Sequence, residues 1–181
     1  VSYGVVRSAQ DTGNLGYKLA LDGGVTVSME AARNTSAGGT DNTYGVTYTG
    51  IDGMTLALGV GSTATGGTAE VASETAGIKY ATGALTFGLQ LTKVETDGTT
   101  EDEDGTHMGV TYNVNDDFTV GYVRQETDFS GSSSDEEHSG IQASYSMGSI
   151  SFSGRVSKLD NQGGSASASD EDKHITMSIA F

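Results

Sequence analysis

The end of the chain alternates strictly between two faces of an extended strand. The apolar face carries Ile175, Met177, Ile179 and Phe181, and the other face carries His174, Thr176, Ser178 and Ala180. An alternating apolar strand that ends on an aromatic residue is typical of a β-barrel in a membrane, because apolar side chains face lipid there and aromatic rings lie at the headgroups. We therefore expect a membrane-spanning strand with Phe181 at the membrane interface.

The composition excludes several classes of protein. The chain has 181 residues, enough for one ordinary domain, with 27 Gly and no Pro, Cys or Trp. Its 24 acidic residues outnumber its 9 Lys and Arg, which gives a net charge of −15. This charge argues against nucleic acid as a partner, because phosphate binding needs clustered cations. Without Cys, the chain has neither disulfides nor thiolate metal sites.

The low hydrophobicity has a structural explanation. Hydrophobic residues make up 35% of the chain, below the roughly 45% of ordinary globular proteins. They nevertheless recur at every second position, a pattern that a disordered chain has no reason to keep. A barrel with a wet interior accounts for the deficit, because only the outward half of each strand must be apolar.

A hairpin-sized repeat organises the chain. Each repeat contains a strand that ends in tyrosine, a short turn and a second alternating strand, and the tyrosines are Tyr48, Tyr80, Tyr112 and Tyr145. We expect these rings at the membrane interface, where a tyrosine can bury its ring and keep its hydroxyl among headgroups. The alternative is that they cover the core of a soluble sandwich, but the opposite strand face lacks a second apolar set to pack against.

The pattern predicts twelve strands, at 1–8, 14–21, 25–33, 43–49, 54–62, 74–81, 84–94, 106–113, 118–126, 138–147, 150–159 and 172–181. Short connections alternate with longer ones, which cover 34–42, 63–73, 95–105, 127–137 and 160–171. This asymmetry is typical of outer-membrane barrels, which have short periplasmic turns and longer outside loops. The expected fold is all-β: a single domain over 1–181 that forms a transmembrane antiparallel up-and-down barrel.

Strand parity also predicts the residues of the pore wall. The predicted pore-lining residues are Lys18, Glu30, Lys79, Gln90, Gln142 and Arg155. A charge on the lipid face near the bilayer centre costs roughly 2–4 kcal/mol, so parity places these charges in water. Lys18 and Glu30 lie about one diagonal step apart on a tight hairpin, so a structural ion pair is an equal alternative for them. Arg155 is the leading candidate for tuning ion flow.

The longer loops are rich in carboxylates. Candidate metal ligands are Glu101, Asp102, Glu103 and Asp104. Such oxygen ligands suit Ca²⁺, but the spacing of an EF-hand loop is absent, so loop-bound Ca²⁺ is the weaker interpretation and a solvated loop the stronger one. No cofactor is expected.

Catalytic motifs are missing from the sequence. His107, His138 and His174 are scattered over separate predicted strands. No nucleophile elbow, P-loop or zinc-binding helix motif occurs. A Ser–His site built from Ser144 or Ser178 remains as an enzymatic alternative.

The chain resembles the bacterial general porins, in particular the acidic porins of alphaproteobacteria. The resemblance rests on the Gly-Val-Thr-Tyr hairpin at 109–112, the Phe-Thr-Val-Gly-Tyr strand at 118–122, the acidic loops and the ending at 175–181. It implies a 16-stranded trimer in the outer membrane that passes small hydrophilic solutes and carries a constriction loop inside the barrel. Outer-membrane lipid and lipopolysaccharide are the implied surroundings.

The sequence departs from that pattern in two ways. Twelve strands are too few, and no loop is long enough to form a constriction. We expect the chain to be the C-terminal part of a longer porin, and a complete narrow barrel of 12 strands is the alternative. The expected function is passive diffusion of small solutes and ions with a mild cation preference. The alternatives are a 12-stranded lipid hydrolase and a translocator.

Overall fold

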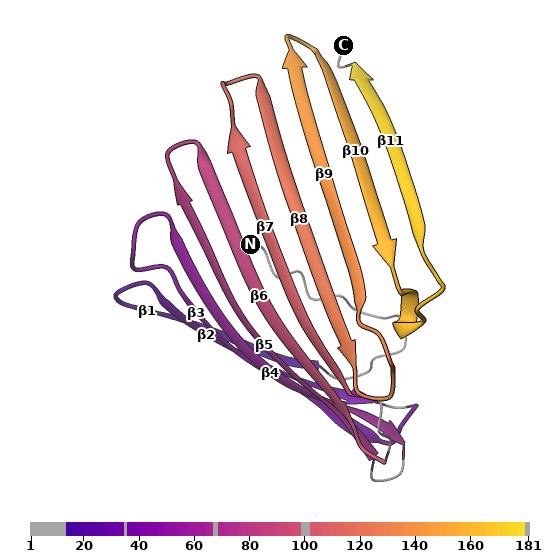
Figure 1. The fold of residues 1–181 in the computed structure, drawn as a ribbon. Coiled ribbons are helices and arrows are strands. Elements are labelled where there is room, and N and C mark those ends of the chain that lie inside the picture. The colour runs from indigo at the N-terminus through magenta and orange to yellow at the C-terminus, as the bar shows by residue number, and fades with distance from the viewer. Residues whose placement is uncertain (1–13, 35, 67–68, 99–101, 180–181) are drawn as a thin grey trace.

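The described strands form a single antiparallel β-sheet (Figure 1). The computed structural model describes residues 14–34, 36–66, 69–98 and 102–179. The strands are β1 (Asn14–Leu21), β2 (Val25–Asn34), β3 (Gly39–Tyr48), β4 (Met54–Gly66), β5 (Ala69–Thr82), β6 (Leu85–Thr96), β7 (Glu103–Asn113), β8 (Phe118–Phe129), β9 (Glu136–Met147), β10 (Ile150–Asp160) and β11 (Asp170–Ile179). A 3₁₀ turn, η1 (Gln162–Gly164), precedes β11. None of the helices in the described ranges is long and apolar enough to cross a membrane.

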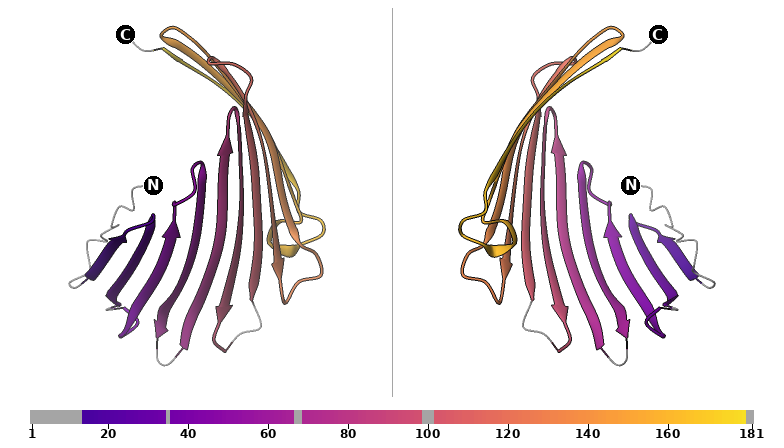
Figure 2. Two further views of the ribbon diagram at one scale, coloured as in Figure 1. Left: turned by 90° about the vertical axis from the view of Figure 1, so that its left-hand side faces the viewer. Right: turned by 90° about the vertical axis from the view of Figure 1, so that its right-hand side faces the viewer.

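The sheet is a meander that curves into a trough. Each strand pairs only with its neighbours in sequence, and β1 and β11 form the two edges of the described sheet. Figure 2 shows the curvature from two sides. No hydrophobic side chain in the described part of the chain is buried. The fold is therefore an open segment of an up-and-down barrel wall, one layer thick and without a conventional core.

The predicted strands are confirmed in number and order from β1 to β11. The ends at the short turns agree to within about one residue, but the opposite ends extend further, so that β5 begins at Ala69 and β8 continues to Phe129. The predicted long loops were therefore too long. Near these ends the outward side chains are polar, so the apolar alternation stops. The strands nevertheless remain hydrogen-bonded there, as the pairing of Glu74 with Lys93 shows. The predicted strand 1–8 lies outside the described residues.

Local chemistry fixes the short turns. Gly53 and Gly83 have φ values of 72° and 55°, a region that glycine enters without a Cβ clash. The turn before β8 contains no glycine. There, the Asn115 side-chain oxygen accepts hydrogen bonds from the backbone N–H groups of Asp117 (2.9 Å) and Phe118 (2.8 Å). These turns set the register from which the two faces of the sheet follow.

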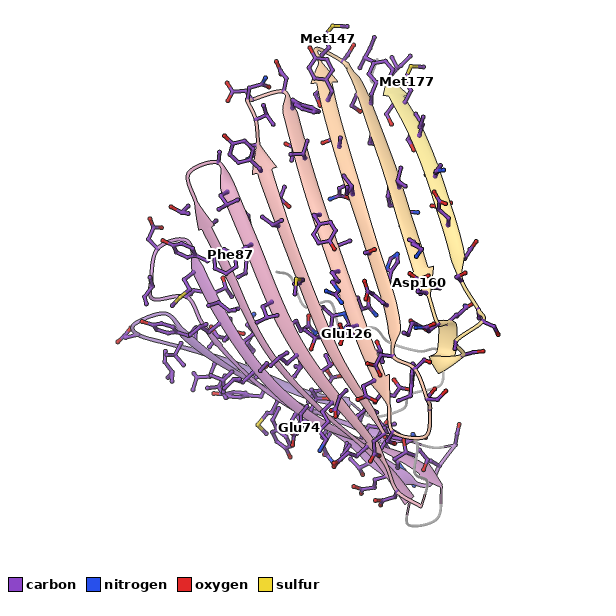
Figure 3. All side chains as sticks on the ribbon, viewed as in Figure 1. Glu74, Phe87, Glu126, Met147, Asp160 and Met177 are labelled. Carbon is purple, nitrogen blue, oxygen red and sulfur yellow. The ribbon has the colours of Figure 1, made fainter. Side chains whose placement is uncertain are left out.

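The convex face is apolar from the turn ends to beyond the middle of the strands. Its exposed side chains include Leu58, Leu91, Ile141, Val156 and Ile175, with exposures between 48% and 85%. Figure 3 shows Phe87, Met147 and Met177 toward the turn ends, and Glu74, Glu126 and Asp160 toward the opposite ends. A broad exposed apolar surface of this kind marks a face that meets a membrane or another protein.

Candidate pore wall

The concave face of the trough consists of the opposite strand parity. A hollow of about 930 Å³ runs along it and is lined by residues from β1 through β9, including Lys18, Ser28, Thr47, Thr55, Lys79, Gln90 and Gln125. The lining side chains of this parity are small, hydroxylated, amide, imidazole or cationic, with Val123 as the exception. The polar set faces the inside of the curve and the apolar set faces outward, the reverse of a soluble domain.

The structure places the predicted pore-lining residues on this concave face. Lys18, Lys79 and Gln90 line the hollow. Gln142 and Arg155 line a second hollow of about 400 Å³ near the β11 edge. Glu30 is on the same face of β2 as Ser28. It lies opposite Gly16, two residues along the strand from the Lys18–Ser28 pair. Their role in conduction stays a prediction, because a position on the concave face does not by itself show that a residue affects ion flow.

A polar row that was not predicted from the sequence crosses the wall. Gln90, His107, Gln125 and His138 stand opposite one another in register on four consecutive strands, β6 to β9. The sequence pattern places the two histidines on separate strands and does not predict this alignment. Of the three pairs in this row, only His107 and Gln125 lie across a short turn, so turn length alone could have aligned only that pair.

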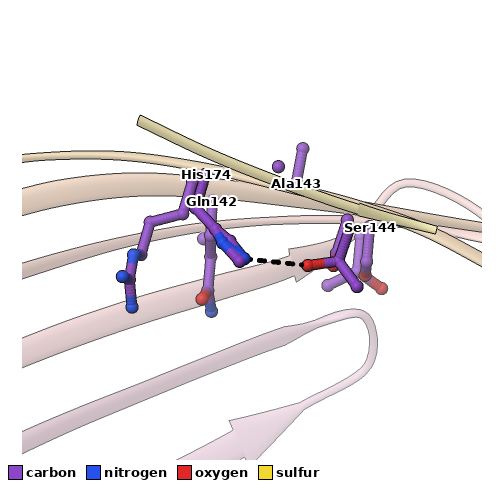
Figure 4. A pocket seen from close by; sticks show the side chains of 10 residues that line it. Gln142, Ala143, Ser144 and His174 are labelled. Atoms are coloured by element: carbon purple, nitrogen blue, oxygen red, sulfur yellow. Dashed lines mark hydrogen bonds between the residues drawn. The ribbon is translucent and has the colours of Figure 1, made fainter. Parts of the chain in front are cut away.

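Arg155 forms an ion pair on the concave face. Its Nη2 lies 2.9 Å from Oδ2 of Asp172, and the two side chains are 59% and 55% exposed. In the same hollow, Nε2 of His174 lies 3.2 Å from Oγ1 of Thr176, which the dashed line in Figure 4 marks. The hydrogen-bond partner of this imidazole is therefore a threonine, whereas the enzymatic alternative requires a serine such as Ser144.

Carboxylates outnumber cations on the concave side of the described strands. The cations are Lys18, Lys79 and Arg155, and the carboxylates are Glu30, Asp41, Glu103, Glu136, Asp170 and Asp172. The acids stand mostly toward the ends of the strands remote from the short turns. The concave face of the described strands is therefore negatively charged overall and carries a few isolated positive charges.

A protein family and several solved structures are similar to this chain. A family model described as Gram-negative porin matches residues 32–181. The chain belongs to the Gram-negative porin family. It is accordingly an integral protein of the bacterial outer membrane, and the predicted resemblance is confirmed. No curated protein sequence matches the chain.

Solved porins share the fold of this porin. An anion-selective porin from Comamonas acidovorans superposes with a TM-score of 0.74 at 18% identity, covering 93% of this chain and 59% of the other. A porin refined at 1.8 Å superposes with a TM-score of 0.75 at 17% identity, covering 92% of this chain and 60% of the other. A Rh. blastica porin mutant gives 0.60 at 15% identity, with 93% and 79% covered. This porin chain thus spans about 60% of the length of the first two structures.

The predicted interface tyrosines of this porin stand together near the short turns. Tyr48 ends β3, and Tyr80, Tyr112 and Tyr145 lie within three residues of the ends of β5, β7 and β9. Phenylalanines from adjacent strands pair with two of them edge to face, Phe87 with Tyr80 at 5.8 Å and Phe118 with Tyr145 at 6.5 Å between ring centroids. Their interfacial role stays a prediction, and Phe181 lies outside the described residues.

The carboxylates suggested as metal ligands diverge in the porin sheet. Glu103 and Asp104 are consecutive in β7 and point to opposite faces, with Asp104 opposite Lys93. Asp102 precedes the strand, and Glu101 lies outside the described residues. No cluster of three or more metal-ligating side chains occurs among the residues that the structure describes. Loop-bound Ca²⁺ stays an untested prediction.

Proposed function

We propose that this porin forms a water-filled channel through which small hydrophilic solutes and ions diffuse passively. The observation that carries the proposal is the inverted sheet: polar and charged side chains line the concave face, and apolar side chains cover the convex face. Closed into a barrel, such a wall encloses water and meets lipid. Passive diffusion needs a polar passage and no catalytic group, so we propose no enzymatic activity and no cofactor.

A mild preference for cations is the second part of the proposal. The excess of carboxylates on the concave face supports it, together with the net charge of −15. A charged wall in a narrow aqueous passage raises the local concentration of the opposite ion. A porin of this fold is anion-selective. The fold alone therefore does not determine ion selectivity, which depends on the charged residues of the pore wall in each protein.

The assembly we propose is a homotrimer surrounded by outer-membrane lipid and lipopolysaccharide. The convex face supports this because its apolar side chains are exposed over many strands. Subunit contacts and lipid contacts both require an apolar surface. Nucleic acid is no partner in this proposal, because the net charge repels phosphate chains.

Liposome swelling tests the channel directly. The purified full-length protein, reconstituted into vesicles, is expected to let small sugars enter at rates that fall with solute size. The reversal potential across a bilayer in a KCl gradient then gives the selectivity. Vesicles that stay impermeable although the protein is folded would refute the channel, and a reversal potential of anionic sign would refute the cation preference alone.

A further inference from the structure

The large hollow on the concave face differs in charge from the rest of the chain. None of the described residues that line it is acidic, although the chain contains 24 Asp and Glu. The charged side chains of concave parity in its lining are Lys18 and Lys79. A solute in this hollow therefore meets positive charge, whereas the concave face as a whole is negative.

Part of the hollow is a recess on β6 and β7. Its floor is the pair Gly88 and Gly109, which stand directly opposite each other and both line the hollow. A Cβ atom on either glycine would come no closer than 3.7 Å to the surrounding atoms, so no side chain from another strand fills this space. The backbone of the floor is therefore accessible to a flat ligand.

Polar side chains flank the floor on both sides. Thr86 stands opposite Thr111 on the side of the short turns, and Gln90 stands opposite His107 on the other side. Thr86 and Gln90 are four residues apart along β6, which corresponds to about 13 Å. Hydroxyl, amide and neutral imidazole groups both donate and accept hydrogen bonds, as sugar hydroxyls do. The recess therefore offers matching partners to two edges of a polyhydroxylated ring.

Gln90 and His107 are each held from the side away from the floor. Nε2 of Gln90 donates a hydrogen bond to Oγ1 of Thr75 at 3.3 Å, and Nε2 of His107 lies 3.4 Å from Oγ1 of Thr92. Thr75 and Thr92 are themselves opposite each other, one row further from the short turns. Among the described residues, these contacts use neither Oε1 of Gln90 nor Nδ1 of His107, so both atoms can bind a hydroxyl group of a ligand.

Lys79 closes one end of the recess. It lies on β5 directly opposite Gly88, and its neighbour on the other side is Thr55 of β4. Lys79 forms no ion pair with any residue that the structure describes, whereas Arg155 on the same face pairs with Asp172. Its ammonium group therefore has three N–H donors for an anionic ligand.

Val123 lies at the other end of the recess, on β8 opposite Gly109. The recess is therefore asymmetric, with a cation at one end, an apolar side chain at the other and hydrogen-bonding groups along both sides. A zwitterionic amino acid fits this arrangement poorly, because no carboxylate in the lining of the hollow could receive its ammonium group. A neutral sugar would leave Lys79 without an anionic partner.

From this arrangement we infer that the recess binds a sugar acid, a polyhydroxylated ring that carries one carboxylate. The ring lies over the glycine floor, Lys79 binds the carboxylate, and Gln90 and His107 bind hydroxyl groups on one edge while the two threonines bind those on the other. The inference rests on the proposed function and deepens it, because a solute reaches the recess through the water-filled passage. Sugar acids are then held at a saturable site, and other small solutes only diffuse past it.

A ligand-observed NMR titration of the full-length protein in detergent with glucuronate and with glucose tests the inference. The parent is expected to bind glucuronate about tenfold more tightly than glucose, because a hydrogen bond between two charged groups is added. Lys79→Gln is expected to remove this difference and to leave the affinity for glucose unchanged.

Lys18→Gln is the matched control for charge. It removes the same charge from the same hollow, but β1 lies four strands from β5, about 19 Å away, and the Debye length at physiological salt is about 8 Å. We expect an unchanged affinity for glucuronate. A parent that binds glucuronate no better than glucose would overturn the inference, and so would an equal loss of affinity in the two lysine variants.

Gly88→Val tests the floor without a change of charge. The valine Cβ has room, so we expect the barrel to fold and the side chain to fill the recess and abolish glucuronate binding. Gly154→Val is the matched control, because a Cβ also has room there but points to the convex side of β10. Glucuronate binding that survives Gly88→Val would contradict a site in the recess.

Bilayer conductance of the same samples separates this inference from the proposed channel. A folded parent without conductance would refute the channel, and the glucuronate affinities in detergent would still decide the recess. A conducting parent without a preference for glucuronate would refute the recess alone.

Discussion

Arg155 is one of three cations on the concave side of the described strands, together with Lys18 and Lys79. Its side chain pairs with Asp172. By contrast, four other cations have the outward parity: Lys93, Arg124, Lys158 and Lys173. Replacing Arg155 therefore changes the charge of the passage rather than that of the membrane surface. Strand parity was sufficient to predict this side of the wall. The partner Asp172 was not predicted, because it lies on the neighbouring strand and its position depends on the pairing of β10 with β11.

Arg155→Glu is expected to raise the cation selectivity of the channel. The change replaces a positive wall charge with a negative one beside Asp172, so cations become more concentrated at that level. The reversal potential in a KCl gradient measures the effect. Arg33→Glu is the matched control, because it makes the same charge change on the convex side of β2 and should leave the potential as it was. If Arg155→Glu also leaves the potential unchanged, this arginine does not line the pore.

Gly53 in the turn before β4 is expected to resist replacement more than Gly83. Both have positive φ, where an alanine costs about 1–2 kcal/mol. A Cβ at Gly53 would also collide with the Ala81 carbonyl oxygen, whereas a Cβ at Gly83 would meet nothing within 4 Å. Urea unfolding in lipid vesicles should therefore show a larger loss of stability for Gly53→Ala. Equal losses would mean that the turn relaxes away from Ala81.

Within each strand, apolar and polar residues alternate, so that apolar side chains face the convex side of the sheet and polar side chains face the concave side. Periodicity was enough to find β1 to β11 in order, because each of these strands has one apolar and one polar face. The same signal misjudged the strand ends. Beyond the apolar band, both faces are polar, and only the backbone ladder shows that β5 and β6 continue to pair as far as Val71 and Thr96.

Adjacent residues of β6 should respond oppositely to the same substitution. Leu89→Lys places a charge in the apolar band and is expected to destabilise the folded barrel by about 2–4 kcal/mol, whereas Gln90→Lys points into the hollow and should fold normally. The fraction of heat-modifiable protein after reconstitution, followed by urea titration, measures both. Comparable stability for the two variants would contradict the assignment of the faces.

At the scale of the whole molecule, the sheet is an open wall with two free edges in its described part. The sequence alone predicted the class of fold, since apolar alternation without a second apolar set has few soluble solutions. It could not predict the polar row of Gln90, His107, Gln125 and His138, because that row arises only when four strands are in register. The proposed channel requires that the concave face of this wall encloses water.

Single-channel recording in a planar bilayer tests that claim most directly. The full-length protein is expected to insert in steady conductance steps that scale with the conductivity of the KCl solution, grouped in threes if the barrel assembles as a trimer. Such scaling is the behaviour of a water-filled passage. Folded protein that inserts into the bilayer without any conductance would contradict the account.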